Sequence, residues 1–266
     1  MVHPNARPIY LEGNSDTDVL IFHGYTGSPS YFKNMAVELN SRFGATVSVP
    51  LLPGHGTKIE DLDHLKYRHF RKFADHEAKR VLRSGKKLVV GGFSFGSQLA
   101  LWLAGRYPVV AVFTIAVPYR LRFPFNVPGI WIIGKFIKSV PKIISAAEKE
   151  LQENFHYYKM PSYTLEVMNL ANRDVKRALK KIKAPCLSVY GEGDPVSNRK
   201  ESLDAIDEYL KSPIHEHFII EGTKNHNIFY PHTQKITDAV ASFLERHRVF
   251  KENKISDRIK IPAGLV

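Results

Sequence analysis

The sequence predicts one α/β domain of 266 residues, built on a mostly parallel sheet with helices on both faces. Two observations lead to this fold class. Up to residue 116, apolar runs with β propensity alternate with helix-prone stretches, an order that favours parallel strands joined by helices. The apolar runs are also continuous rather than alternating, as in strands that are buried on both faces.

In the first half of the chain, each predicted strand ends at a turn and a predicted helix follows. A short edge strand is expected at 8–11, and buried strands at 19–22, 45–49, 88–91 and 109–116. The first helix opens at Ser28-Pro29 and places Phe32, Met35, Ala36 and Leu39 on one face. Further helices are expected over most of 61–82 and over 98–104.

After Pro118 the alternation stops, and no convincing strand pattern is found between 119 and 181. Helical patterns there, at 133–140, 143–151 and 173–181, predict a helical cap at 118–181 inserted into a core of 1–117 and 182–247. Strands return at 186–190 and 217–220, and helices are expected around 203–210 and over 233–247. Residues 248–266 are charged and weakly patterned, so we expect a loosely held tail.

The chain is basic, with 38 Lys and Arg against 26 Asp and Glu and a formal charge of +12. The basic residues are scattered, and no helix-turn-helix, RNP or zinc-ligand pattern organises them. We therefore expect an ordinary solvated surface and no specific nucleic-acid partner. Electrostatic association with anionic lipid or nucleic acid stays as an alternative, and it would show as steep salt dependence.

Composition also bears on the compartment. The single cysteine, Cys186, falls in a predicted strand and permits no intramolecular disulfide. The first residues contain no apolar signal region, and no run of about 18 apolar residues could span a membrane. We expect a cytoplasmic protein, for which peripheral membrane contact stays open.

A candidate nucleophile stands at the apex of a strand–turn–helix pattern. The pentapeptide Gly92-Phe93-Ser94-Phe95-Gly96 has the form G-x-S-x-G, follows the strand at 88–91 and precedes a helix-prone run. This is the pattern of a nucleophile elbow, in which small residues two positions either side of the serine let strand and helix pass closely. A glycine-rich turn with a helix-capping serine would be the purely structural interpretation.

A serine hydroxyl needs a base, and the base needs an orienting carboxylate. On a parallel sheet such groups gather at the carboxyl ends of the strands. By this rule His226, just after the last strand, is the predicted base, with His55 as its competitor. Asp194, just after the strand at 186–190, is the predicted carboxylate, with Glu192 as its competitor.

An oxyanion formed at the substrate carbonyl needs two hydrogen-bond donors. The backbone N–H of Phe95, directly after the nucleophile, is one candidate. The other is the backbone N–H of Tyr25, in the loop after the strand at 19–22, where Gly24 permits close approach.

Five stretches together resemble the carboxylesterase and monoacylglycerol lipase branch of the α/β-hydrolases, over roughly residues 7–247. They are the following: His23-Gly24-Tyr25-Thr26-Gly27-Ser28, Leu52-Pro53-Gly54-His55-Gly56-Thr57 with Asp61-Leu62 behind it, Gly92-Phe93-Ser94-Phe95-Gly96, Gly191-Glu192-Gly193-Asp194, and Asn225-His226. The order serine, aspartate, histidine is that of this superfamily. The resemblance implies the α/β-hydrolase fold, an eight-stranded type of sheet often trimmed at its first strands, and a cap after the sixth strand. It also implies hydrolysis of carboxylic esters of small alcohols or glycerol, with no cofactor.

The chain departs from the family pattern at Phe95 and Ser97, where members often have Met or Leu and Gly. We expect the bulk of Phe95 to narrow the acyl pocket, and Tyr25 and Trp131 to contact substrate. The predicted function is a serine esterase that forms an acyl-enzyme and takes a small ester with an apolar acyl chain. Thioester, amide or carbon–carbon hydrolysis by the same residues stays open, as does a non-catalytic binding module, which the presence of all three triad residue types argues against.

Overall fold

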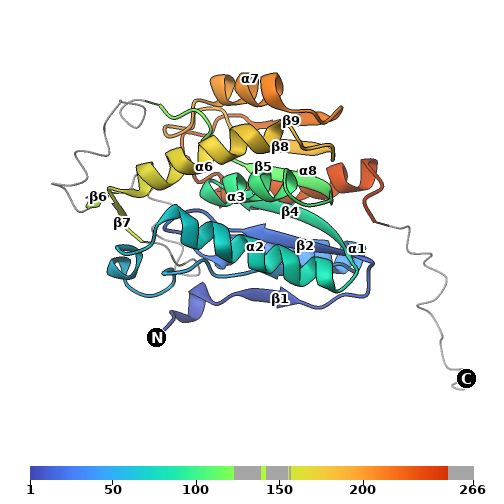
Figure 1. The fold of residues 1–266 in the computed structure, drawn as a ribbon, viewed down its shortest axis with the longest axis horizontal. Coiled ribbons are helices and arrows are strands. Elements are labelled where there is room, and N and C mark those ends of the chain that lie inside the picture. The colour runs from blue at the N-terminus through green and yellow to red at the C-terminus, as the bar shows by residue number, and fades with distance from the viewer. Residues whose placement is uncertain (123–138, 142–154, 156, 251–266) are drawn as a thin grey trace, which may run out of the picture.

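In the computed structural model, which describes residues 1–122, 139–141, 155 and 157–250, helices cover both faces of one central sheet (Figure 1). The sheet has seven strands in the order β1-β3-β2-β4-β5-β8-β9. They are β1 (Ile9–Leu11), β2 (Thr17–Phe22), β3 (Thr46–Val49), β4 (Lys87–Phe93), β5 (Val109–Ile115), β8 (Cys186–Gly191) and β9 (His215–Ile220). The predicted fold class is confirmed.

Every strand pair of the sheet is parallel except β1 with β3. The central strands β2, β4 and β5 carry the continuous apolar runs, and β2 is buried along its whole length. The predicted edge strand is β1, which lies antiparallel at one side of the sheet. Because the other strands share one direction, their carboxyl ends meet at one edge, where the candidate nucleophile, base and carboxylate were expected.

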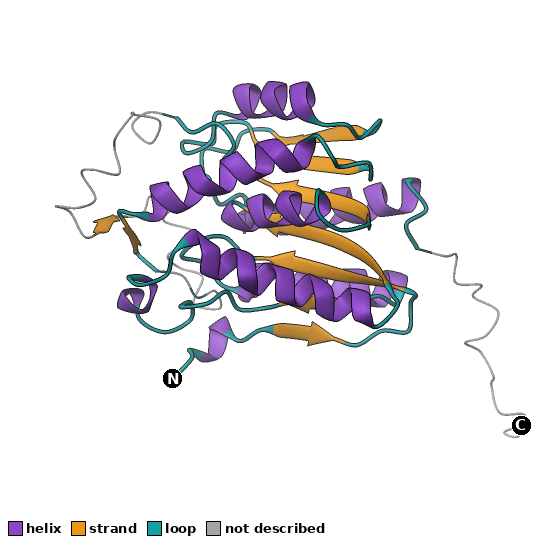
Figure 2. Cartoon of the chain, in the orientation of Figure 1, coloured by secondary structure: helices purple, strands orange, loops and turns teal. Residues whose placement is uncertain are grey.

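The helices form two layers (Figures 1 and 2). On one face lie α2 (Tyr67–Arg83), α3 (Phe95–Ala104), α6 (Thr164–Leu179) and α7 (Arg199–Tyr209), and on the other α1 (Lys33–Phe43) and α8 (Phe229–Arg246). Short 3₁₀ turns lie at Pro4–Ala6, Pro29–Phe32 and Ile59–Leu62. No helix within the described ranges has the length and apolar character needed to cross a membrane.

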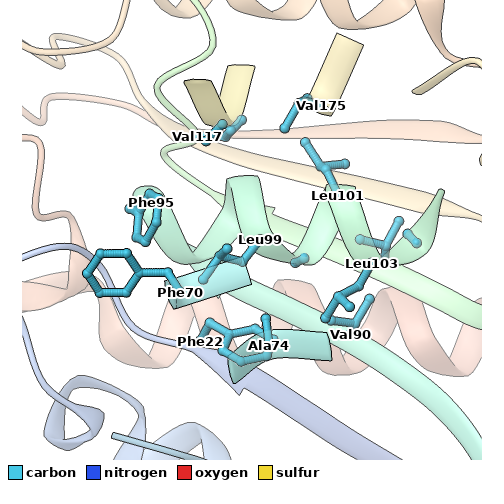
Figure 3. Packing of buried hydrophobic residues seen from close by; sticks show 14 of the residues in the cluster. Phe22, Phe70, Ala74, Val90, Phe95, Leu99, Leu101, Leu103, Val117 and Val175 are labelled. Atoms are coloured by element: carbon cyan, nitrogen blue, oxygen red, sulfur yellow. The ribbon is translucent and has the colours of Figure 1, made fainter. Parts of the chain in front are cut away.

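Each helical layer packs on its own face of the sheet. Figure 3 shows the first of these cores, in which Leu99 and Phe95 of α3 lie beside Phe70 of α2 and Phe22 of β2. The second core joins α1 and α8 to the opposite face. The helix α1 fits this position because Met35, Leu39 and their neighbours repeat at helical spacing, and it ends at Gly44, whose φ is 62°.

The predicted cap is partly described. It contains two strands that its sequence pattern did not indicate, β6 (Ser139–Pro141) and β7 (Lys159–Pro161), which pair antiparallel. The helix expected at 173–181 is α6, which begins earlier, at Thr164, and packs against α3 and α2. The predicted helices at 133–140 and 143–151 lie mostly or wholly outside the described residues.

The start of the predicted tail is packed rather than loose. The Val249 side chain is buried, and the Phe250 ring stacks on Phe43 of α1, with ring centroids 4.5 Å apart and planes at 8°. The remainder of the tail lies outside the described residues.

Candidate active site

Ser94 lies between β4 and α3 in a strained turn. Its φ and ψ are 51° and −120°, a conformation that costs a residue other than glycine about 1–3 kcal/mol. Its N–H donates to the Ile115 carbonyl at 2.8 Å, which fixes the turn against β5. This sharp turn places Ser94 at the carboxyl end of the sheet, as the elbow pattern predicts.

The glycines of the elbow are required by backbone contacts. A Cβ on Gly92 would lie 2.3 Å from the Gly96 carbonyl carbon, and a Cβ on Gly96 would lie 2.0 Å from the Phe22 carbonyl oxygen. Such separations are far shorter than any van der Waals contact, so strand and helix could not pass at this distance with larger residues.

We therefore expect Gly96→Ala to lower the free energy of unfolding by about 3 kcal/mol, the upper part of the range for overpacking, as measured by urea denaturation. Gly85→Ala is the matched control, because Gly85 has φ +77° and nothing within 4 Å of an added Cβ. It should cost about 1 kcal/mol from backbone conformation alone. Equal losses in the two variants would contradict the steric account.

Three side chains predicted from strand ends form one hydrogen-bonded chain. The Asp194 Oδ2 accepts from His226 Nδ1–H at 2.8 Å, and the His226 Nε2 lies 2.8 Å from the Ser94 Oγ. With the Nδ1 proton facing the carboxylate, the Nε2 lone pair is free to accept from the serine hydroxyl. The Phe93 ring, 5.4 Å from the imidazole centroid, packs beside the base.

Asp194 is held by the loop that follows β8. Its side chain is fully buried, and its Oδ1 accepts from the N–H groups of Val196 at 2.8 Å and Ser197 at 3.0 Å. These bonds leave Oδ2 for the imidazole. The competing carboxylate, Glu192, instead accepts from the Gly222 N–H, so it braces the neighbouring loop and makes no contact with His226 in the part of the chain described.

The chain segments that carry the two predicted oxyanion donors both adjoin Ser94. Phe95 is the first residue of α3, so helix geometry gives its N–H no intrahelical acceptor. A Cβ on Gly24 would lie 3.3 Å from the Ser94 Cβ, which places the backbone before Tyr25 directly against the serine. The helix N-terminus beneath Ser94 also favours negative charge there.

Two buried histidines clamp the loops that carry Tyr25. The Thr26 N–H donates to the His55 Nε2 at 3.1 Å, and the His55 Nδ1–H donates to the Pro53 carbonyl at 2.9 Å. In the reverse direction, the Leu52 N–H donates to the His23 Nε2 at 2.9 Å, and the His23 Nδ1–H donates to the Gly24 carbonyl. Burial lowers the pKa of His55 to about 4 and that of His23 well below its usual value. Both rings are therefore uncharged near neutral pH. Because each His55 nitrogen already has a backbone partner, His55 makes no contact with Ser94 as a base would.

The clamp predicts a pH dependence of stability. The His55 pKa is about 4 in the folded chain, against a reference value of 6.5. The unfolded chain therefore takes up the proton first, and stability is lost as pH falls from about 6.5 to 4. This proton uptake should lower the free energy of unfolding by about 2 kcal/mol between pH 7 and pH 5.

The variant His55→Gln keeps a donor and an acceptor but does not titrate. Urea denaturation at pH 7 and pH 5 should therefore show a smaller pH-dependent loss in His55→Gln than in the parent, by that amount. An unchanged pH dependence would show that His55 does not contribute to it.

An apolar cavity opens beside Ser94 and His226. Most of its lining is aliphatic, aromatic or thioether, and it also includes the loop of the candidate oxyanion donor. The lining residues are Tyr25, Thr26, Gly27, Tyr31, Phe93, Ser94, Met160, Leu165, Met168, Pro195, Val196, His226 and Asn227. A cavity of this kind suits an apolar group attached to a reacting carbonyl.

Of the three side chains expected to contact substrate or shape the acyl pocket, Tyr25, Phe95 and Trp131, only Tyr25 is found in the cavity lining of the described residues. Tyr25 lines the cavity. The Phe95 ring is fully buried against Tyr25 and Phe70 in the core and is not part of the cavity lining, because the first turn of α3 directs it toward α2. The Phe95 side chain therefore does not narrow the cavity as expected. Trp131 lies outside the described residues.

The helix α6 supplies Leu165 and Met168 to the cavity, which the sequence analysis missed. The helix is fixed by an amide pair: the Nε2 of the buried Gln98 donates to the Asn172 Oδ1 at 2.7 Å and to the Met168 carbonyl at 3.0 Å. The Asn172 Nδ2 in turn donates to the Pro118 and Tyr119 carbonyls. The amphipathic pattern of 164–179 could have revealed the helix, but not which residues face Ser94.

Known proteins resemble the chain in sequence and in fold. The chain is 26% identical to the thermostable monoacylglycerol lipase of Bacillus sp. (strain H-257) over 191 residues, which is 72% of this chain and 75% of the relative. It is 24% identical to the carboxylesterase of Bacillus subtilis (strain 168) over 199 residues, 74% of this chain and 79% of the relative.

Among solved structures, one described with LipS and LipT, two metagenome-derived lipolytic enzymes, matches with a TM-score of 0.80 and 23% identity, covering 93% of this chain and 100% of the other. The monoacylglycerol lipase of Paleococcus ferrophilus matches with a TM-score of 0.74 and 16% identity, covering 90% and 98%. A model of the alpha/beta hydrolase family matches residues 19–241. With the sheet order and the elbow in place, the chain belongs to the alpha/beta hydrolase family.

Proposed function

We propose that this protein is a serine esterase of the carboxylesterase or monoacylglycerol lipase type. The observation that carries the proposal is the continuous chain from Asp194 through His226 to Ser94, with 2.8 Å at both contacts, at the mouth of an apolar cavity. The named activities of the two curated relatives, a monoacylglycerol lipase and a carboxylesterase, agree with it.

In the first step the Ser94 Oγ attacks the ester carbonyl while His226 takes its proton at Nε2. The imidazolium that forms is stabilised by the buried Asp194 carboxylate, which keeps the ring oriented through Nδ1. The protonated Nε2 then donates to the leaving alcohol oxygen, and the carbon–oxygen bond breaks. The product of this step is an acyl ester on Ser94.

The negative charge on the carbonyl oxygen develops between the backbone N–H groups of Phe95 and Tyr25. Preorganised donors of this kind are worth about 3–4 kcal/mol each in known hydrolases. The His55 bond to the Thr26 N–H fixes the residue after Tyr25, so the loop does not need to rearrange as the charge forms.

In the second step a water molecule attacks the acyl ester, with His226 as the base, and releases the acid. The apolar lining, which includes Tyr31, Leu165 and Met168, favours an acyl chain over a polar group. Each buried methylene contributes about 0.8 kcal/mol, which corresponds to about a fourfold gain in kcat/KM until the cavity is filled.

The experiment is a series of p-nitrophenyl esters from acetate to long-chain acyl groups, together with monoacylglycerols and matched thioesters and anilides. The expected result is ester hydrolysis that rises with chain length and then reaches a plateau. Thioesters or anilides cleaved faster than the matched esters would change the reaction class. A folded protein that hydrolyses none of these compounds would contradict the esterase proposal and favour the alternative of a non-catalytic binding module.

A further inference from the structure

A second group of reactive side chains lies at the amino end of β9, at the opposite end of the strands from Ser94. His215 and His217 alternate along β9 and so point to the same face, and Asp207 reaches them from α7. One potential ligand atom from each residue lies within 4.8 Å of the others. The reaction proposed above uses none of the three.

The distances suit ligands of one small ion. The His215 Nδ1 lies 2.5 Å from the Asp207 Oδ1, the His217 Nε2 lies 3.1 Å from the His215 Nδ1, and the His217 Nε2 lies 3.5 Å from the Asp207 Oδ2. Two ligands bound tetrahedrally to Zn²⁺ at 2.0–2.1 Å are about 3.3 Å apart. The 3.1 Å and 3.5 Å separations bracket that value. The 2.5 Å contact involves the other Asp207 oxygen, Oδ1, and is about 0.8 Å shorter, so the exposed Asp207 side chain would have to move away from His215 when the ion binds.

No arrangement of protons on the neutral rings uses all three contacts. If His215 Nδ1 carries its proton toward Asp207, it has no lone pair to accept from His217, and a proton on His217 Nε2 would face it across 3.1 Å. If His215 Nδ1 is bare, its lone pair faces a carboxylate oxygen at 2.5 Å. A cation bound by one atom from each residue would remove this conflict, because His215 Nδ1, His217 Nε2 and an Asp207 oxygen would each direct a lone pair at it.

Buried hydroxyl groups orient the His215 ring through Nε2, the nitrogen that does not face Asp207. Its Nε2 lies 2.8 Å from the Ser188 Oγ, and that hydroxyl lies 3.1 Å from the Thr114 Oγ1. Both hydroxyl side chains belong to nearly fully buried residues. With Nε2–H donating to Ser188, the Nδ1 lone pair points at Asp207 and His217, as a second hydrogen-bond partner does for metal-binding histidines.

We propose that Asp207, His215 and His217 bind one divalent transition-metal ion, with Zn²⁺ the best fit to two imidazoles and one carboxylate. The Asp207 side chain is 47% exposed and that of His217 is 34% exposed, so the ion is reached from solvent and a fourth position stays open to water. The bound ion joins the carboxyl end of α7 to the edge strand β9. Its role is structural, because the proposed active site lies at the other end of the sheet.

The test uses the full chain, without a histidine tag, after treatment with a chelator. Zn²⁺ titration by calorimetry should give one ion per chain, and Co²⁺ should give the visible absorption of a tetrahedral site. His217→Ala and Asp207→Asn, both at exposed side chains, should each weaken Zn²⁺ binding at least tenfold. Zn²⁺ should raise the thermal midpoint of the parent but not that of His217→Ala.

Two controls separate this site from general surface binding. His64→Ala removes an exposed histidine elsewhere, and Glu208→Gln removes the exposed carboxylate next to Asp207. Both should bind Zn²⁺ as the parent does. No binding by the parent, or equal affinity in the parent, His217→Ala and Asp207→Asn, would overturn the proposal and leave an ordinary aspartate–histidine ion pair.

Discussion

Ser94→Ala is expected to lower kcat for ester hydrolysis by about 10⁶-fold, the loss seen when a nucleophile that acts with a base is removed. The variant should fold normally, because the bond from the residue-94 N–H to the Ile115 carbonyl does not involve the side chain. The measurement is single-turnover and steady-state hydrolysis of the best p-nitrophenyl ester, with circular dichroism to confirm the fold.

Ser41→Ala is the matched control for this loss. Ser41 is exposed on α1, and its hydroxyl donates only locally, to the Glu38 carbonyl, so full activity is expected. Retained activity in Ser94→Ala would remove Ser94 from the reaction and with it the acyl-enzyme mechanism.

Asp194→Asn is expected to lower kcat by about 10⁴-fold. The amide oxygen of the new side chain would keep the bonds from the Val196 and Ser197 N–H groups, which leaves the NH₂ group facing His226. The imidazole would then carry its proton on Nε2, facing Ser94, and could no longer accept the hydroxyl proton. The readout is kcat for the same ester at neutral pH.

Glu192→Gln provides the comparison for Asp194→Asn. Glu192 lies two residues earlier and was the sequence-level competitor, yet its carboxylate accepts from the Gly222 N–H. A change of no more than a few-fold is expected. If Glu192→Gln lost as much activity as Asp194→Asn, the assignment of the orienting carboxylate would be wrong.

The sequence predicted those parts of the fold that local pattern controls. The buried strands, the elbow at Ser94 and the order of serine, aspartate and histidine could be identified because each depends on a short run of residues and its place at a strand end. The strand-end rule selected Asp194 and His226, with Glu192 and His55 as competitors, and the structure brings the selected side chains to hydrogen-bonding distance.

Features set by partners distant in the chain could not be predicted. His55 was a competing base by position, but its two bonds, to Thr26 and Pro53, make it a loop clamp. The first turn of α3 directs the Phe95 ring into the core, where it meets Phe70. In both cases the residue type is visible in the sequence and its partner is not.

The same reason explains the missed parts of the cap and of the β9 edge. The strands β6 and β7 have three residues each and pair only with one another, so neither has a periodic pattern of its own. The Asp207, His215 and His217 group joins a helix to a strand, so the sequence does not show that Asp207 lies beside the two histidines.

The most direct test of the central claim is covalent labelling with an alkyl fluorophosphonate, followed by intact-mass and peptide mass spectrometry. We predict one adduct per chain, located on Ser94, and labelling of His226→Ala that is at least a thousandfold slower, because the serine would lack its base. A folded chain that is not labelled, or that is labelled at another residue, would contradict the assignment of Ser94 as an activated nucleophile.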